Sequence, residues 1–265
     1  MFNYLTVKNL TEGVVNAELN RPPANAVHRE MYIEIKELFS NLDSYAENAR
    51  AVVLSAAGKH FCAGNDLDEF ATMTPENAEE RMWRVREAFF SISECCVPVI
   101  GAVQGAALGT GLALAASCDF LVASRDSRFG LPELTVGVMG GARHLGRLVS
   151  QPVVRRMYFT GEPLPVQELA QYGAAIIVTE PDELLERATQ MATRVSRFSP
   201  TAVRVSKRIL DEIEWMDLRT GYEFEQGGTV RMSGHKDSKE ALAAFAEKRV
   251  AVYETRSEDK HWFGV

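Results

Sequence analysis

Three glycine-rich stretches of this sequence contain the residues best suited to bind a negatively charged group. They cover residues 58–67, 104–111 and 137–142, and each comes after a segment that favours extended structure. Glycine adopts positive φ and lets the backbone approach a ligand closely. A strand-to-helix turn built in this way exposes backbone N–H groups at the start of a helix, where they stabilise developing negative charge.

Several other kinds of catalytic site do not fit the sequence. Glycines at 105, 109 and 111 lack the GxGxxG spacing of a dinucleotide site, so a nicotinamide cofactor is not expected. The five histidines include no HxxxH or HExxH pair, which argues against a catalytic metal, and no GxSxG motif indicates a serine hydrolase. We expect His60 and His144, which lie in or near the glycine-rich stretches, to have surface or capping roles.

The composition is that of an ordinary globular protein that needs no structural disulfide or metal. Its 265 residues include 29 Lys+Arg and 36 Asp+Glu, which gives a formal net charge of −7. Because no dense basic run is present, neither nucleic acid nor a membrane surface is expected as a partner. The four cysteines form no CxxC pair, and no signal peptide or membrane span is recognisable. We therefore expect a cytoplasmic protein.

Strand and helix patterns alternate over much of the chain. Short apolar runs predict strands at residues 5–7, 14–19, 51–54, 98–103, 120–123 and 174–178. Apolar spacings of three and four, or runs of small residues, predict helices at residues 28–42, 75–95 and 109–117. Strands that alternate with helices indicate an α/β core in which the sheet is covered on both faces.

The C-terminal part of the chain is predicted to be helical. The expected helices cover residues 181–197, 200–213, 218–231 and 238–253, with a hinge near residues 198–200. We therefore expect an α/β core over residues 1–198 and a helical region over residues 199–265.

Four motifs follow one another along the chain. They are residues 61–67 (FCAGNDL), 105–111 (GAALGTG), 118–119 (CD) and 129–133 (FGLPE). Their order and spacing resemble the crotonase family, the enoyl-CoA hydratases and isomerases, and the likeness extends from Leu19 to Arg249. It implies an α/β spiral of ββα units, with C-terminal helices that cover the active site and build a homotrimer or a dimer of trimers. It also implies an acyl-CoA substrate and no cofactor beyond the coenzyme A moiety.

The resemblance assigns roles to individual residues. In this family two backbone N–H groups hold the thioester oxygen while the acyl group becomes an enolate, and the matching positions are Asn65 and Thr110. Many relatives have glycine at the Thr110 position. The residues implied to line coenzyme A are Ala63, Asn65, Asp66, Leu67, Asp68, Gly109, Thr110, Gly141 and Lys248. Relatives often have lysine at the Asp68 position, and Lys248 would approach the nucleotide from a neighbouring subunit.

One of the two glutamates that hold water in the hydratases of this family is missing. The second glutamate matches Glu133, whereas the first falls on Ala113. Burial against an apolar pocket would raise the pKa of Glu133 into the range that suits a proton shuttle. One carboxylate is enough to move a proton from C2 to C4 of a 3-enoyl-CoA, so double-bond isomerisation is slightly favoured.

Three alternatives to isomerisation remain open at this point. Crotonase relatives with one glutamate can still hydrate an enoyl-CoA. Decarboxylation and C–C hydrolysis use the same backbone donors with other side chains. The missing glutamate is also compatible with a member that binds acyl-CoA without turning it over. The shape of the pocket decides which acyl chain the protein accepts, and the sequence does not give that shape.

Overall fold

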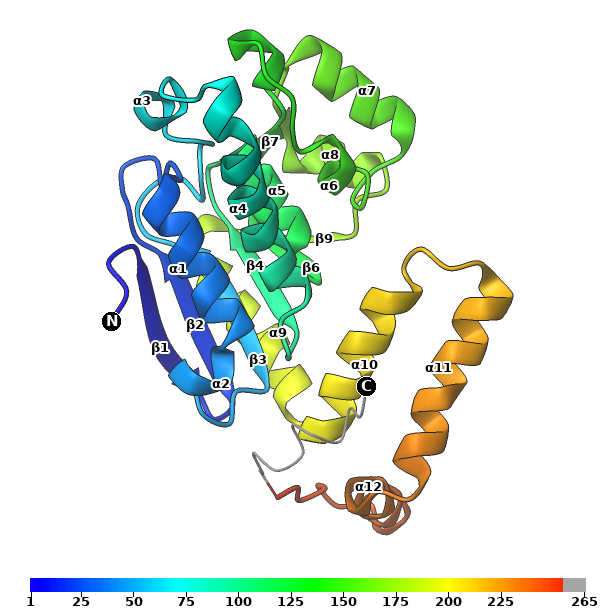
Figure 1. The fold of residues 1–265 in the computed structure, drawn as a ribbon. Helices are drawn as coiled ribbons and strands as arrows, with labels where there is room; N and C mark the ends of the chain where they lie inside the picture. The colour runs from blue at the N-terminus through cyan, green and yellow to red at the C-terminus, as the bar shows by residue number, and fades with distance from the viewer. Residues whose placement is uncertain (255–265) are drawn as a thin grey trace.

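The computed structural model describes residues 1–254. It has a mixed α/β core with helices on both faces of the main sheet (Figure 1). Within the described range, no helix is both long enough and apolar enough to cross a membrane. Residues 255–265, the end of the predicted helical region, lie outside the described residues.

A six-stranded sheet forms the centre of the fold, in the order β1-β2-β3-β4-β6-β9. Its strands are β1 (Leu5–Thr11), β2 (Val14–Leu19), β3 (Ala51–Ala56), β4 (Val99–Val103), β6 (Phe120–Ser124) and β9 (Ile176–Thr179). The first two form an antiparallel hairpin, and every later pair is parallel. All six predicted strands are therefore confirmed, although β1 extends further and β9 begins later than expected.

Three very short strands form a second sheet, in the order β5-β7-β8. They are β5 (Ala106–Leu108), β7 (Arg128–Gly130) and β8 (Leu164–Pro165). These strands were not predicted, because two or three residues are too few to show a period of two. The parallel pairing of β5 with β7 places the second glycine-rich stretch beside the segment that leads to Glu133.

Helices cover both faces of the large sheet. On one face, α1 (Arg29–Ser40) packs against α4 (Pro75–Ser93), and on the other face α9 (Leu184–Ser196) packs against β3, β4 and β6. Successive strand side chains point to opposite faces, so Val52 belongs to the larger apolar core and Val53 to the cluster under α9. This explains why the sequence shows continuous apolar runs at these strands.

Shorter helices connect these elements. They are α2 (Leu42–Tyr45), α3 (Leu67–Phe70), α5 (Thr110–Ser117), η1 (Glu133–Val136), α6 (Ala142–Leu145), α7 (Gln151–Thr160), α8 (Val166–Gln171) and η2 (Pro181–Glu183), where η denotes a 3₁₀ turn. Of these, α3, α5 and α6 each begin at the end of one glycine-rich stretch, as expected for turns that lead into a helix. Every residue of α5 is buried.

Three helices follow the core and form what we call the C-terminal arm. They are α10 (Pro200–Ile213), α11 (Leu218–Ser233) and α12 (Lys236–Glu247). Figure 1 shows α11 and α12 standing away from the large sheet. The helix predicted at residues 238–253 ends sooner than expected, because Lys248 takes up a left-handed conformation with φ 55°.

The C-terminal arm combines a buried charged anchor with exposed apolar side chains. Lys207 of α10 is only 3% exposed, and its Nζ lies 2.9 Å from Asp119 Oδ1 and 3.0 Å from Asp211 Oδ1. In contrast, Leu218 of α11 and Phe245 of α12 are 90% and 87% exposed. The arm therefore presents apolar surface that residues 1–254 leave uncovered.

Candidate active site

The three glycine-rich stretches meet around the side chain of Glu133. A side-chain carbon placed on Gly109 would lie 3.0 Å from Glu133 Oε1 and 3.9 Å from Gly64 Cα. A carbon placed on Gly141 would lie 3.6 Å from the same oxygen. Because each glycine comes from a different stretch, the fold gathers all three turns beside one carboxyl group.

Two backbone amides at this meeting point have no protein acceptor within residues 1–254. They belong to Asn65 and Thr110. The peptide groups around Asn65 are paired, since Val27 N donates to Gly64 O and Asp66 N donates to Val27 O, both at 2.9 Å. Thr110 is the first residue of α5, so its N–H is one of the unpaired donors at the positive end of the helix. Both amides are therefore unpaired donors within the described residues.

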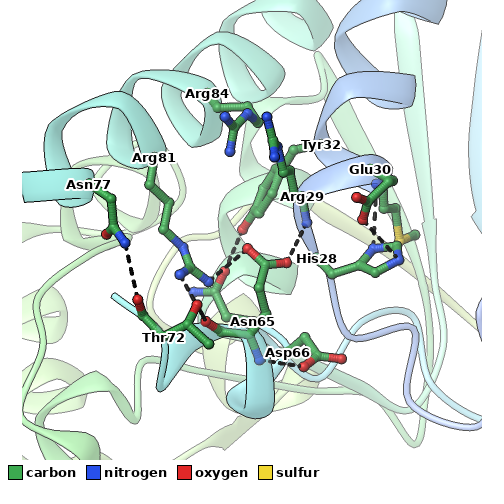
Figure 2. Close-up of polar contacts among 12 residues, drawn as sticks. His28, Arg29, Glu30, Tyr32, Asn65, Asp66, Thr72, Asn77, Arg81 and Arg84 are labelled. Carbon is green, nitrogen blue, oxygen red and sulfur yellow. Dashed lines mark hydrogen bonds and ion pairs between the residues drawn. The ribbon is translucent and has the colours of Figure 1, made fainter. Parts of the chain in front are cut away.

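A buried tyrosine links the side chains of these two residues. The Tyr32 hydroxyl donates to Asn65 Oδ1 at 2.6 Å, as Figure 2 shows, and lies 2.9 Å from Thr110 Oγ1. The amide oxygen of Asn65 can only accept, so Thr110 donates to the Tyr32 oxygen. Burial raises the pKa of Tyr32 far above its usual range, and the hydroxyl therefore stays neutral. Tyr32 was missed in the sequence, where it is only one more member of an apolar helix face.

Charged contacts hold the segment that follows Asn65 (Figure 2). Asp66 caps α3 by accepting a hydrogen bond from Glu69 N at 3.0 Å, and it pairs with Arg21 at 2.6 Å. The bond from Glu69 N, followed by the contact with Arg21, lowers the pKa of Asp66. The Glu69 side chain pairs with Arg81 of α4 at 2.8 Å and accepts a backbone N–H at the start of α1. The segment is therefore tied to both long helices.

The Glu133 carboxyl is poorly solvated. Glu133 begins η1 directly after Pro132, and its Oε2 is buried with no hydrogen-bond partner in the part of the chain that the structure describes. Burial raises the pKa of Glu133. An uncompensated buried carboxylate is unfavourable, so this group binds a proton more readily than an exposed glutamate does. A carboxyl with a raised pKa is suited to take up a proton and release it again.

No second acid comes from α5. Ala113 lies one turn into this helix and is 1% exposed, and none of the residues from Thr110 to Ser117 is acidic. The adjacent α6 contains His144, whose ring packs edge-on against the ring of Phe89 with the two centroids 5.1 Å apart. Burial, helped by nearby arginine charges, lowers the pKa of His144 to about 4. His144 is therefore uncharged at neutral pH and lies in an aromatic cluster.

The ring of His60 makes a structural hydrogen bond with the backbone. Its Nδ1 accepts a hydrogen bond from Ala106 N at 3.1 Å, at the first residue of β5. The expected capping role agrees with this contact, which fixes the first glycine-rich stretch to the second.

Most of the residues assigned to the site lie together, and one does not. Those at or next to the meeting point are Ala63, Asn65, Asp66, Gly109, Thr110, Glu133 and Gly141. Leu67 and Asp68 are exposed on α3, at the edge of the same segment. Lys248 ends α12, and Figure 1 shows α12 and α3 at opposite ends of the molecule. Within one chain, Lys248 therefore lies far from α3.

Comparisons with known proteins agree on one family. The model of the enoyl-CoA hydratase/isomerase protein family matches residues 9–256 of this chain. The short-chain-enoyl-CoA hydratase of Clostridium acetobutylicum is 33% identical, over 87% of this chain and 90% of that protein. A Mycobacterium tuberculosis protein named (7aS)-7a-methyl-1,5-dioxo-2,3,5,6,7,7a-hexahydro-1H-indene-carboxyl-CoA hydrolase is 32% identical, over 89% and 96% of the two chains.

Solved structures support the same assignment. The crystal structure of an enoyl-CoA hydratase from Bacillus anthracis matches this fold with a TM-score of 0.90 and 31% sequence identity, over 96% of this chain and all of that one. The fold is therefore the crotonase fold. Fold, motifs and sequence identity together show that the chain belongs to the enoyl-CoA hydratase/isomerase family, whose members act on acyl-CoA.

Proposed function

We propose that this protein isomerises a 3-enoyl-CoA to the 2-enoyl-CoA and that Glu133 carries the proton. One observation supports this most directly: the buried, unpaired Oε2 belongs to a carboxyl that lies against Gly109, beside the unpaired amides of Asn65 and Thr110. The chain has alanine at position 113 and no acidic residue on α5. A reaction that needs only one carboxylate fits this arrangement best.

The proposed proton transfers balance with one carboxylate. Glu133 removes a proton from C2, and the electron pair of that C–H bond forms an enolate with its charge on the thioester oxygen. Backbone N–H groups of Asn65 and Thr110 donate to this oxygen and lower the barrier. Glu133 then returns the proton to C4, the double bond moves to C2–C3, and the carboxylate is ionised again. No water and no cofactor beyond the coenzyme A moiety takes part.

We further propose that coenzyme A lies along residues 63–68, next to Gly109 and Gly141. Lys248 would then reach its nucleotide from a neighbouring copy, and the exposed apolar side chains of the C-terminal arm would be covered in a homotrimer or a dimer of trimers. Sedimentation analysis tests this assembly. A protein that sediments as a single chain at micromolar concentration would contradict it.

Hydration by Glu133 alone is the second candidate, since the Clostridium acetobutylicum relative is named a hydratase. Another crotonase reaction, such as decarboxylation or C–C hydrolysis, is the third, and the Mycobacterium tuberculosis relative is named a hydrolase. A member that binds acyl-CoA without turnover is the fourth candidate, and Ala113 favours it. Each of these predicts a different result with defined thioesters.

A panel of 2-enoyl- and 3-enoyl-CoA thioesters of several chain lengths distinguishes these candidates. We expect 3-enoyl-CoA to be converted to the conjugated 2-enoyl product faster than 2-enoyl-CoA is hydrated. Glu133→Gln should lower kcat by about 10²- to 10⁴-fold, whereas the exposed control Glu47→Gln should not. Faster hydration than isomerisation, tight binding with no turnover, or full activity of Glu133→Gln would each contradict the proposal.

A further inference from the structure

We propose that Tyr32 is a positioning residue for this reaction. Its hydroxyl would hold the side chains of Asn65 and Thr110 so that the two backbone N–H donors keep the orientation that the thioester oxygen requires. This inference rests on the proposed function, in which those two amides bind the enolate oxygen.

The two donors need such a constraint because of the residues that precede them. Each N–H belongs to a peptide group shared with a glycine, Gly64 before Asn65 and Gly109 before Thr110. Both glycines have positive φ, 120° and 54°. Glycine has the least restricted backbone of all residues, so local sterics alone hold the following peptide group weakly. A backbone hydrogen bond holds the carbonyl side of each group, since Val27 N donates to Gly64 O at 2.9 Å and Ala113 N donates to Gly109 O at 3.0 Å, so the freedom that remains lies on the N–H side. A contact on the far side of each peptide group restricts that freedom.

Tyr32 supplies this contact to both residues at once. Asn65 lies in the loop before α3, Thr110 begins α5, and Tyr32 projects from α1 between them. The tyrosine is itself held firmly, since its side chain is 4% exposed and its ring packs edge-on against Phe89 of α4 with the centroids 6.2 Å apart. One rigid side chain from the core therefore ties the two donor residues together.

The hydrogen-bond pattern favours positioning over direct proton transfer. Tyr32 has one proton, which it donates to Asn65 Oδ1, and its oxygen accepts from the Thr110 hydroxyl. Burial raises the pKa of Tyr32, so the hydroxyl is a poor proton donor to substrate and does not ionise near neutral pH. Its effect on the reaction is therefore exerted through Asn65 and Thr110.

Tyr32→Phe removes the hydroxyl and keeps the ring. We expect kcat to fall by about 10- to 100-fold, because misplacing catalytic groups by a fraction of an ångström to an ångström costs up to about that much. KM should change little, since coenzyme A contacts remain. The matched control is Tyr45→Phe, which removes an exposed hydroxyl bonded to Glu37 at 2.8 Å and should retain full activity.

The stretching frequency of the thioester carbonyl reports how the backbone N–H groups of Asn65 and Thr110 are oriented, and measuring it requires no turnover. The probe is crotonyl-CoA with ¹³C at this carbonyl, and its stretching frequency is compared free and bound by infrared difference spectroscopy. In the wild-type protein two aligned donors should lower the frequency, and in Tyr32→Phe part of this shift should be lost. An equal shift and an equal kcat in the two proteins would overturn the role of Tyr32. A wild-type protein that binds the probe without any shift would instead overturn the proposed function.

Substitutions at the other end of the contact separate positioning from a general loss of stability. Thr110→Ser keeps a hydroxyl, whereas Thr110→Val removes it with little change in shape, so kcat should fall further in the valine variant. Because Tyr32→Phe and Thr110→Val break the same contact, the double variant should lose little more than the worse single variant. If the fall in kcat of the double variant equals the product of the falls in the two single variants, a shared positioning role is contradicted.

Discussion

The carboxyl of Glu133 lies directly against the backbone of Gly109. A side-chain carbon at Gly109 would lie 3.0 Å from Glu133 Oε1, which is tight enough that the carboxyl would have to shift by a few tenths of an ångström. Parallel pairing of β5 with β7, together with the 2.9 Å bond from Gly109 N to Gly130 O, brings the two residues side by side. Gly109 also has φ 54°. This position therefore favours glycine for its backbone, and any side chain here would press on Glu133.

Replacing Gly109 by alanine should displace the carboxyl and strain the turn. We expect Gly109→Ala to lower kcat by about 100-fold or more and to cost about 1–3 kcal/mol of unfolding free energy, because φ 54° with ψ −116° is a backbone conformation that alanine rarely adopts. Steady-state kinetics and thermal melting measure the two effects. The matched control is Gly173→Ala, since Gly173 has φ 94° but open space around it. It should show a similar stability cost with full activity, and equal activity of the two variants would contradict the close contact with Glu133.

The raised pKa of Glu133 links this carboxyl to folding. The folded state binds its proton more readily than the unfolded chain, whose carboxyl has a pKa near 4.5. The contribution of Glu133 to stability is therefore complete below that pH and is lost as the pH rises through the higher folded-state pKa. Glu133→Gln avoids this loss, so it should melt at a higher temperature than the wild-type protein at pH 7, and the difference should shrink toward pH 4. Melting temperatures measured across this pH range test the prediction. If the wild-type protein melts at a higher temperature than Glu133→Gln at pH 7, the burial of Oε2 is contradicted.

The anchor of the C-terminal arm should be sensitive to the loss of its lysine. Lys207→Met leaves the half-buried carboxylates of Asp119 and Asp211 without their shared cation, which should cost less than the roughly 3–5 kcal/mol typical of a fully buried pair. Burial already raises the pKa of Asp211 to about 6, and the lysine opposes this shift. Denaturant unfolding should show the loss, whereas the exposed control Lys8→Met should unfold like the wild-type protein.

A second variant makes the anchor test specific. In Lys207→Met/Asp211→Asn one of the two stranded carboxylates becomes neutral, so part of the lost stability should return. If the double variant is less stable than Lys207→Met alone, the buried charge contact does not explain the effect.

Local sequence patterns determined most of the large sheet and its covering helices. The apolar runs at residues 51–54 and 98–103 become β3 and β4 because side chains on both faces of these strands are buried. The order and spacing of four motifs, at residues 61–67, 105–111, 118–119 and 129–133, also indicated the family by resemblance. Glu133, Asn65 and Thr110 were selected by their match to the motifs of that family, and the fold brings them to one place.

Only the tertiary structure decided how distant residues meet. Tyr32 lies 78 residues from Thr110, and their contact depends on how α1 packs in the core rather than on any pattern near Tyr32. Burial of Glu133 Oε2, the short strands that place Gly109 beside it, and the separation of Lys248 from α3 likewise follow from packing. Periodicity and turn propensity act over a few residues, whereas a hydrogen bond or a desolvated carboxyl depends on every element that packs around it.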